Sequence, residues 1–515
     1  MPGSLPCFED FGRLPTDIIR EDGFVQGKRA SEVLDLLIIP GGSLVESQSL
    51  KASLIQEILT MADKGKFVLG VCSGLQVLSK ATDIGRLASE PILRPGLGLL
   101  DAEFKPLVCT DRVSATIVGK SFITKTIGAS VTGFHCHTYG KLEVHDNAQP
   151  ILVSHIQRAN YKADPQDLVS GVANKEGNVV GVLMHALLDR NSAIIQNLTE
   201  SLTISTEELE NIRKANGRLV SEMKREVGIS TAITSPTKTV KKSKRARILL
   251  VTATGSGSGK TLIVTGIAGA LKKSGLNVGV VKVGGDIRDL VPALYLVKEP
   301  IRDYSSIRIG ESGWTPFRQA LEEASKNHDF VLVEGAMNAF TGLFNEKAAR
   351  PTSTVEVALA LDVPTLLVVA SDKEGIEGAF VNALSYANLM DTLGIRVKGV
   401  IFNKARSGYL SAEMKTLIKQ AFGNLGISLL GMVPRIDLEG RGLIPEVEIR
   451  YEEFGAKAIK IIEESIDLQL LASLAEPMKK ETKNVEALLE RFKKVITSNP
   501  ELDALVGKER IDNRL

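Results

Sequence analysis

The sequence predicts an α/β protein built from two doubly wound, mostly parallel-sheet domains that are joined by a basic linker. Its 515 residues allow two to four domains at roughly 100–200 residues each. In both halves, short aliphatic runs alternate with helical patterns, and these runs are apolar throughout, as in strands that helices cover on both faces. A Ser-, Thr- and Pro-rich stretch followed by basic residues separates the halves, so each half is expected to form its own sheet.

The composition excludes several classes of protein. With 43% hydrophobic and 24% charged residues, the chain has an ordinary apolar content, which excludes extensive disorder. The formal net charge of +2 gives no general electrostatic reason to bind nucleic acid or an anionic membrane. The apolar runs are too short to span a bilayer, and no leader is expected. The four cysteines lack paired spacing, which fits a reducing compartment, so we expect a cytoplasmic protein without nucleic-acid or membrane partners.

Aliphatic runs of strand length give the expected order of the strands. Two lie in the first half, at residues 35–39 and 67–71. The expected strands of the second half are at residues 247–252, 278–282, 330–334, 365–370, 398–403 and 428–433.

A helix and a linker mark the boundary between the halves. Ser205 and Glu208 have the spacing of a capping box, and an amphipathic pattern follows them. The basic run 241–245 could contact nucleic acid, but without interleaved aromatic residues a solvated linker is favoured. The expected segments are a first domain at 1–204, a helix and basic linker at 205–246, a second domain at 247–475 and a helical tail at 476–515.

A candidate nucleophile lies at the end of the second expected strand. The segment Gly70–Gln76 leads from this strand into a helical pattern, with Cys72 at the turn. A sharp turn of small residues between strand and helix has the geometry of a nucleophile elbow. The helix N-terminus would stabilise a thiolate, and backbone N–H groups there could form an oxyanion hole. A buried structural cysteine is the alternative.

Two other segments favour the catalytic interpretation. The first strand ends in Pro40–Gly42, where a glycine pair can bring a backbone amide close to an anion. A later apolar strand ends at His185, 113 residues after Cys72. A base supplied by a distant strand is how such nucleophiles are usually activated.

At these segments the sequence resembles the class I glutamine amidotransferases, in the branch fused to cobyrinic acid a,c-diamide synthase and cobyric acid synthase. The resemblance implies that Cys72 attacks the side-chain amide of glutamine and that His185 is its base. It also implies that the N–H groups of Gly42 and Ser73 hold the oxyanion, and that Gln76 helps to seat the glutamine.

The first half departs from the family pattern at several positions. Leu187 stands where an acid would follow His185 by two residues, so a Cys–His dyad is expected, as in this branch. His135-Cys136-His137 replaces a Glu-x-His segment, and on a strand its two histidines share a face. A hydrogen-bonded strand pair is favoured there over a metal site with so few ligands. The strand and helix that the family places before Asp35 are hard to see, so a reduced domain edge is expected.

The second half opens on a phosphate-binding loop, in the order strand, glycine-rich loop, Gly-Lys-Thr and helix. The glycines let backbone N–H groups surround phosphates, Lys260 reaches the outer phosphates and Thr261 can ligate Mg²⁺. Thr254 stands where the usual motif begins with glycine. The loop residues are Thr254, Gly255, Ser256, Gly257, Ser258, Gly259, Lys260 and Thr261.

Over about residues 247–475 the resemblance narrows to the a,c-diamide synthases and, in the same lineage, dethiobiotin synthetase. Lys282–Asp289 looks like their Lys-x-Gly-Pro-Asp-x-x-Asp segment, Val333–Met337 looks like their Glu-Gly-x-Met segment, and Arg441–Ile444 follows in family order. The resemblance implies ATP on the loop, with Asn403 at the adenine. The implied Mg²⁺ ligands are Thr261, Asp286 and Glu334, although Asp286 by itself could be a solvated loop acid.

Three further features qualify this resemblance. The family places the synthetase first and the amidotransferase second, whereas here the order is inverted. The segment Asn338–Gly342 lacks a family Asp, and the stretch between Asp289 and Phe330 is short. Both regions face the acyl substrate in the family, so the resemblance supports the chemistry more than the tetrapyrrole specificity. Gly255 stands in place of a second lysine, which argues against the partition-type ATPases.

These observations together predict a glutamine-dependent, ATP-consuming amide ligase. ATP would phosphorylate a carboxylate of a corrin or related tetrapyrrole, and ammonia from glutamine would displace the phosphate. The expected partners are glutamine and this small-molecule substrate, with a homodimer considered. One alternative is a nucleotide-binding regulatory protein with a non-catalytic amidotransferase-like domain. Another is a carboxylate-activating enzyme like dethiobiotin synthetase, which would leave Cys72 without a purpose.

Overall fold

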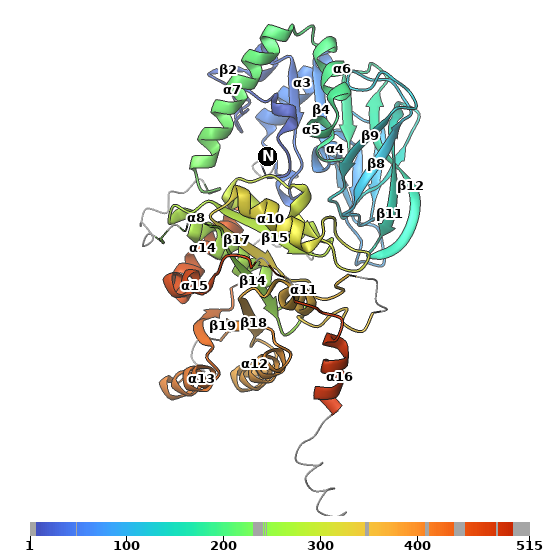
Figure 1. Cartoon of the computed structure of the whole chain (residues 1–515). Coiled ribbons are helices and arrows are strands. Elements are labelled where there is room, and N and C mark those ends of the chain that lie inside the picture. The colour runs from blue at the N-terminus through green and yellow to red at the C-terminus, as the bar shows by residue number, and fades with distance from the viewer. Residues whose placement is uncertain are drawn as a thin grey trace, which may run out of the picture. The chain divides into compact units, whose positions relative to one another are not determined.

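The computed structural model describes residues 7–47, 49–229, 240–241, 243, 245–345, 350–406, 411–436, 449–479, 481 and 483–497. The chain forms two units, each with one seven-stranded sheet, so the predicted α/β class with two sheets is confirmed. The first unit comprises Met1–Ser235, Gly285–Ser305 and Leu438–Ala458, and the second comprises Pro236–Gly284, Ser306–Asp437 and Ile459–Leu515. Figure 1 labels their helices and strands.

The large sheet of the first unit is mixed. Its strand order is β3-β4-β13-β12-β11-β8-β9, with the bounds β3 Leu36–Ile39, β4 Phe67–Val71, β13 Val179–Val182, β12 Lys162–Asn174, β11 Ala148–Ala159, β8 Arg112–Ile117 and β9 Ser130–Phe134. Only the pairs β3–β4 and β4–β13 are parallel. The other four pairs are antiparallel.

The expectation of a mostly parallel sheet is therefore wrong for the first unit. The physical reason is a hairpin: β11 and β12 are joined by Asn160 and Tyr161, both with positive φ, as the tight turns between antiparallel strands require. Parallel strands instead need a long crossover, which the short connections in this part of the chain cannot supply.

Short helices and two small sheets complete the first unit. A four-stranded sheet has the order β10-β7-β5-β6, with β10 Lys141–Val144, β7 Ala102–Lys105, β5 Ala81–Asp83 and β6 Leu93–Pro95, and a two-stranded sheet pairs β1 Phe24–Val25 with β2 Lys28–Arg29. The helices are η1 Phe11–Arg13, α1 Ala30–Val33, α2 Leu44–Ser47, α3 Ala52–Asp63, α4 Ser73–Leu78, α5 Leu187–Arg190, α6 Ser192–Ser201 and α7 Thr206–Arg225. Between residues 7 and 35, no strand is longer than two residues, which agrees with the reduced edge.

Two segments from the second half of the sequence belong to the first unit. Gly285–Ser305 contains η2 Ile287–Leu290, α9 Val291–Val297 and η3 Asp303–Ser305, and Leu438–Ala458 contains the beginning of α14 Tyr451–Ser465. The buried Glu46 carboxylate accepts a hydrogen bond from the backbone N–H of Tyr451 at 3.1 Å. The first unit is thus discontinuous in sequence, whereas the domain limits expected from the sequence are contiguous ranges and stay predictions.

The sheet of the second unit is parallel throughout. Its order is β16-β15-β17-β14-β18-β19-β20, with the bounds β16 Ser306–Ile307, β15 Val278–Val283, β17 Phe330–Glu334, β14 Arg247–Ala253, β18 Thr365–Ala370, β19 Val397–Ala405 and β20 Ser428–Pro434. The six strands predicted from apolar runs are all present within two residues of their expected ends. Their near-complete burial explains why the runs lack polar alternation.

Helices α8 Lys260–Lys273, α10 Phe317–Asn327, α11 Thr354–Leu361, α12 Gly375–Thr392, α13 Ala412–Asn424, α15 Leu468–Leu474 and α16 Leu488–Thr497 accompany this sheet. Helix α16 agrees with the expected helix of the tail. Much of the expected linker, Arg441–Ile444 and the last 18 residues lie outside the described residues.

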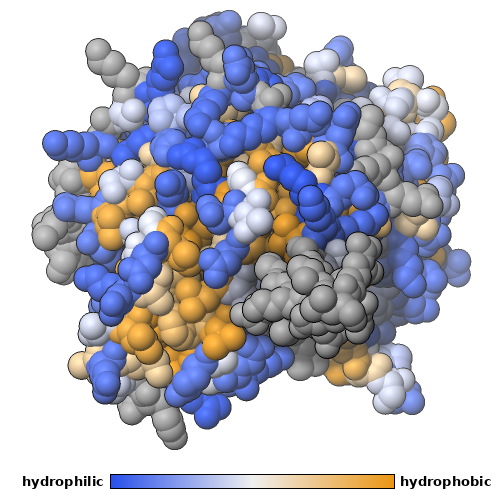
Figure 2. Space-filling view, turned by 60° about the horizontal axis from the view of Figure 1, so that its bottom comes forward, coloured by the Kyte–Doolittle hydropathy of each residue, from blue (hydrophilic) through white to orange (hydrophobic). Residues whose placement is uncertain are grey.

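No helix in the described part of the chain combines the length and apolarity that a bilayer crossing requires. The face shown in Figure 2 carries hydrophobic areas interspersed with hydrophilic side chains.

Candidate active sites

Cys72 lies in a strained turn between β4 and α4. Its backbone has φ 51° and ψ −108°, a conformation that side-chain-bearing residues rarely adopt. Its N–H donates to Val182 O at 2.8 Å, which ties the turn to the neighbouring strand β13. A Cβ on Gly74 would lie 2.0 Å from Ile39 O, so only glycine lets the helix begin this close to β3. The predicted nucleophile elbow is therefore present at Cys72.

The end of β13 brings His185 to the same place. A Cβ on Gly41 would lie 2.7 Å from Cε1 of His185 and 3.5 Å from Cβ of Cys72, so both side chains face the backbone of the Pro40–Gly42 turn. Gly42 is the next residue of this turn. The structure thus brings together the three segments that the sequence pointed to, because β3, β4 and β13 are parallel neighbours whose carboxyl ends meet at one edge.

Ser73 and Gln76 extend this site along α4. Ser73 is the first residue of the helix, where N–H groups have no acceptor within the helix and can bind an anion. Gln76 lies one turn later and donates from Nε2 to Tyr139 O at 3.1 Å.

Glu9, which the sequence interpretation missed, forms a fully buried pair with His185. Its Oε1 is 2.8 Å from Nδ1 of His185, and its Oε2 accepts a hydrogen bond from the N–H of Ala186 at 3.0 Å. The imidazole lies between the rings of Phe8 and Phe134, at centroid distances of 4.6 and 5.2 Å. The expected dyad is therefore wrong in this structure: an acid contacts His185 from 176 residues upstream, although none follows it closely.

The segment that carries Glu9 is held by Asp189. The carboxylate of Asp189 accepts hydrogen bonds from the N–H groups of Asp10 at 2.8 Å and of Gly12 at 2.6 Å. Gly12 has φ 63°, and a Cβ there would lie 2.2 Å from the side chain of Ile195. No periodic pattern marks Glu9 in the sequence, since it precedes a single 3₁₀ turn, and only the tertiary fold shows its role.

The charges around His185 favour its protonated form. Burial lowers the pKa of His185, but the nearby Cys72 and Glu9 side chains outweigh this effect and raise its pKa to about 9. Burial also raises the pKa of the Glu9 carboxyl, and the hydrogen bond with His185 opposes that rise. Near neutral pH the ring can therefore hold a proton at Nε2 and present it towards the Cys72 side.

His135 and His137 form a separate buried pair. Their rings meet edge to face at 4.8 Å, but both residues follow the end of β9 at Phe134, so the expected pair on one face of a strand is not formed. Burial lowers the pKa of both, that of His137 to about 4, which keeps the pair neutral near pH 7. Within the described ranges, no group of three His, Cys, Asp or Glu side chains is arranged to hold a metal ion.

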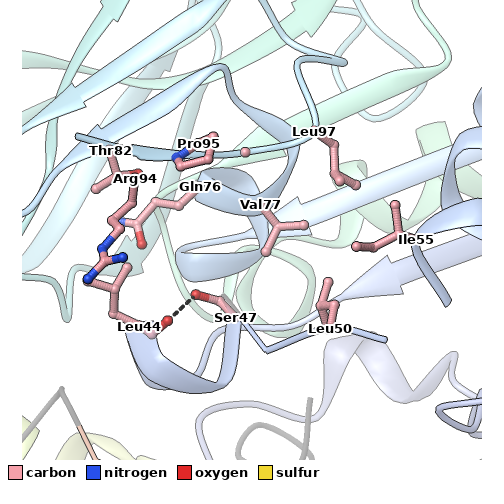
Figure 3. Close-up of a pocket in the computed structure, with 11 residues that line it drawn as sticks. Leu44, Ser47, Leu50, Ile55, Gln76, Val77, Thr82, Arg94, Pro95 and Leu97 are labelled. Carbon is pink, nitrogen blue, oxygen red and sulfur yellow. Dashed lines mark hydrogen bonds between the residues drawn. The ribbon is translucent and has the colours of Figure 1, made fainter. Parts of the chain in front are cut away.

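A small pocket opens beside α4 in the first unit (Figure 3). It has a volume of about 180 Å³. Gln76 and Arg94 supply an amide and a guanidinium to its lining. The other lining residues are Leu44, Ser47, Leu50, Ile55, Val77, Thr82, Pro95, Gly96 and Leu97.

In the second unit, the loop from Thr254 to Gly259 joins β14 to α8. Gly257 and Gly259 have φ of 72° and 82°, as a tight anion-binding loop requires. Ser258 closes the loop by donating from Oγ to Gly255 O at 2.8 Å. The buried Lys260 begins α8 and donates from Nζ to Met337 O.

Glu334 at the end of β17 lies beside this loop. Its Oε1 accepts hydrogen bonds from Oγ1 of Thr261 at 2.9 Å and from Nζ of Lys282 at 3.2 Å. The structure therefore brings Thr261 and Glu334 together, as expected. Lys282 is buried opposite Glu334 in the parallel pair β15–β17. The sequence interpretation placed Lys282 in the family-like segment Lys282–Asp289 but gave it no role at this site.

Asn403 and Asp286 each make side-chain hydrogen bonds within their own unit. Asn403 donates from Nδ2 to Ser258 O at 2.8 Å, and a Cβ on Gly259 would lie 2.2 Å from this nitrogen, so Asn403 braces the loop. Asp286 belongs to the first unit, and both of its carboxylate oxygens accept hydrogen bonds from Arg288, at 2.8 and 2.7 Å. The expected role of Asp286 as a Mg²⁺ ligand stays a prediction.

Two families match consecutive parts of the chain. Residues 7–193 match the family described as CobB/CobQ-like glutamine amidotransferase domain. Residues 249–442 match the family described as CobQ/CobB/MinD/ParA nucleotide binding domain. The amidotransferase match comes first and the nucleotide-binding match second, so the inversion expected from the sequence is not supported.

Named relatives share part of their length with this chain. Hydrogenobyrinate a,c-diamide synthase of Mycobacterium tuberculosis (strain ATCC 25618 / H37Rv) is 32% identical over 211 residues, which cover 40% of this chain and 44% of that protein. Cobyric acid synthase of Dehalococcoides mccartyi (strain CBDB1) is 33% identical over 191 residues, covering 35% of this chain and 36% of that protein. The chain thus spans less than half the length of these relatives. The MinC:MinD cell division protein complex of Aquifex aeolicus matches with a TM-score of 0.30 and 19% identity, over 46% of this chain and 99% of that one, a similarity too low to support an inference.

Proposed function

Because the chain carries a CobB/CobQ-like glutamine amidotransferase domain followed by a CobQ/CobB/MinD/ParA nucleotide-binding domain, we propose that it is a glutamine-dependent amide ligase that consumes ATP. The observation that carries this proposal is the buried array of Cys72, His185 and Glu9 at one edge of the first sheet. Burying an acid is costly unless it is paired, and the partner of Glu9 is the histidine expected to act as the base for Cys72.

In the first unit, the Cys72 thiolate attacks the side-chain amide carbon of glutamine, and the N–H groups of Gly42 and Ser73 stabilise the oxyanion. The carbon–nitrogen bond then breaks as Nε2 of His185 gives its proton to the nitrogen, so that ammonia leaves and a thioester remains. Water next attacks the thioester while His185 takes a proton from it, which releases glutamate and restores the thiolate and the imidazolium. Gln76 orients the glutamine from the first turn of α4.

In the second unit, the loop amides and Lys260 hold the phosphates of ATP. Asn403 braces the loop through Ser258 O and is also the residue that the family resemblance assigns to the adenine. Thr261 and Glu334 present oxygen atoms 2.9 Å apart, the donor type that Mg²⁺ prefers, so these residues fit the ion. Bound Mg²⁺ would neutralise charge on the phosphates. Both carboxylate oxygens of Asp286 accept hydrogen bonds from Arg288. If Asp286 is the third ligand, at least one of these oxygens must bind Mg²⁺ in place of, or in addition to, its hydrogen bond.

The two reactions make one amide. A substrate carboxylate oxygen attacks the γ-phosphorus of ATP, ADP leaves, and an acyl phosphate forms. The ammonia nitrogen then attacks the acyl carbon, and phosphate leaves. The names of the relatives, hydrogenobyrinate a,c-diamide synthase and cobyric acid synthase, support a corrin carboxylate as the substrate.

The proposal is tested by amide formation in the full chain with ATP, Mg²⁺ and hydrogenobyrinate, using either glutamine or an ammonium salt as the nitrogen source. Both sources should give amide and ADP. Glutamine hydrolysis without ATP consumption or amide would favour a regulatory protein, and ADP formation with bicarbonate in place of ammonia would favour chemistry like that of dethiobiotin synthetase.

A further inference from the structure

Arg288 is a buried cation in η2, within the Gly285–Ser305 part of the first unit. The residue is 3% exposed, and burying a guanidinium is costly unless its donors are paired. All three of its nitrogens donate: Nε and one terminal nitrogen to Asp286, the other terminal nitrogen to Oγ1 of Thr138 at 2.9 Å. The terminal nitrogen that donates to Asp286 also donates to the hydroxyl of Tyr161, at 2.6 Å.

The contact with Thr138 places Arg288 next to the glutamine hydrolysis site. Thr138 belongs to the turn Cys136–Tyr139, and two backbone carbonyls of this turn face that site. Cys136 O lies 3.7 Å from Sγ of Cys72, and Tyr139 O accepts the hydrogen bond from Nε2 of Gln76 at 3.1 Å. Thr138 lies between these two carbonyls in the sequence. Backbone hydrogen bonds to Leu107 and Cys109 also hold this turn, and the bond from Arg288 anchors it through a side chain.

We propose that Arg288 is a positioning residue for glutamine hydrolysis, which fixes the Cys136–Tyr139 turn through Thr138. This rests on the proposed glutaminase activity of Cys72 and assigns to that site a residue from the second half of the sequence. The bidentate pair with Asp286 sets the plane of the guanidinium. The hydrogen bond to the Tyr161 hydroxyl and the Tyr161 ring, whose centroid lies 5.6 Å from Cζ of Arg288, limit its movement.

A second consequence concerns the limits of the amidotransferase part. The family match over residues 7–193 does not include Arg288, so a fragment cut at the expected domain boundary would lack the group that holds the turn. Glutamine hydrolysis therefore depends on Gly285–Ser305 even when no amide is being made.

The test measures glutamine hydrolysis by the full chain without ATP. Thr138→Val removes the hydroxyl while keeping the shape of the side chain, and Arg288→Gln removes the cation. Each should raise the KM for glutamine about tenfold, the scale of one lost hydrogen bond to a charged group, while the melting temperature of Thr138→Val stays near the parental value. In the double variant, the effect should not exceed that of Arg288→Gln alone, because both changes remove one contact.

Lys224→Gln is the matched control. Lys224 forms an ion pair with Glu299 of the same Gly285–Ser305 segment at 3.1 Å, but within the described residues its side chain does not bond to the turn. This variant should leave the KM for glutamine unchanged. A folded Thr138→Val protein with parental KM, or additive effects in the double variant, would overturn the proposal. If the parental chain hydrolyses no glutamine at all, the proposed function itself is wrong.

Discussion

The two candidate sites are assembled in opposite ways. In the second unit, the phosphate loop is one continuous stretch, and its partners Lys282 and Glu334 stand opposite each other in neighbouring parallel strands. In the first unit, Glu9, Cys72 and His185 come from three distant segments, and their alignment depends on long-range packing. The nucleotide site should therefore be sensitive to local changes in the loop, whereas the glutamine site should be sensitive to changes in segments that never touch glutamine.

The largest effect is expected at Cys72. Cys72→Ala should lower glutamine hydrolysis about 10⁴-fold or more, because the nucleophile is lost, while amide formation with an ammonium salt continues. Cys109→Ala, at another buried cysteine of the same unit, should retain both activities. Loss of ammonium-dependent amidation in a folded Cys72→Ala protein would contradict the separation of the two sites.

Changes at the phosphate loop should have the opposite pattern. Lys260→Ala should stop amide formation with either nitrogen source, since a cation is lost where negative charge develops, and leave glutamine hydrolysis in place. Lys273→Gln, at the other end of α8, is the control and should amidate normally. Parental amidation by Lys260→Ala with ammonium would show that carboxylate activation does not occur at this loop.

Glu334→Gln should impair turnover more than nucleotide affinity, because the loop amides still hold the phosphates. It also removes the charge that faces the buried Lys282, and breaking such a pair commonly costs about 3–5 kcal/mol. Thermal unfolding must therefore be measured beside the kinetics. A folded variant that binds ATP but does not amidate is the expected result, and unaltered turnover would count against the assigned role.

Glu9→Gln tests the dispersed site most directly. The amide keeps the size of the side chain but cannot stabilise the imidazolium, so glutamine hydrolysis should fall about 10²-fold or more. Asp22→Asn, at an exposed acid of the same N-terminal part, should have no effect. If Glu9→Gln hydrolyses glutamine at the parental rate, Glu9 is not part of the catalytic site, and the Cys72–His185 dyad expected from the sequence describes the site better.

A smaller effect is expected in the pH dependence. The pKa of His185 is raised to about 9, so its imidazolium persists up to about pH 9. The stabilisation that this pairing gives the fold is complete below the ordinary pKa of 6.5 and is lost as the pH rises through about 9. The kcat/KM for glutamine hydrolysis should therefore fall above about pH 9, as the proton needed by the leaving ammonia is lost. Because Glu9 contributes to the raised pKa, Glu9→Gln should move this fall to lower pH. An unchanged alkaline limb would contradict the pairing.

The same contrast explains what could be predicted from the sequence. The six strands of the second unit and the contact between Thr261 and Glu334 were predictable, because buried parallel strands are uniformly apolar and their carboxyl ends converge. The Cys72 turn was predictable from its small residues. Glu9 was not, since its partner lies 176 residues away and no local pattern distinguishes it from a solvated acid.

Asp286 is a second residue whose side-chain partners the sequence did not indicate. The family pattern assigned it to Mg²⁺, and the sequence did not indicate that both carboxylate oxygens accept hydrogen bonds from Arg288, which also bonds to Thr138 and Tyr161 far away in the sequence. The mixed sheet of the first unit was missed because β11 and β12 are partly exposed and rich in polar residues, so no continuous apolar run marks them in the sequence.

The central claim is that nitrogen released at Cys72 becomes the amide of a carboxylate activated by ATP. Its most direct test follows glutamine labelled with ¹⁵N in the side-chain amide, incubated with the full chain, ATP, Mg²⁺ and hydrogenobyrinate. The account predicts ¹⁵N-amide in the product, with one ADP formed for each amide, and no labelled product from Cys72→Ala. Unlabelled product, or labelled product formed without ADP, would contradict it.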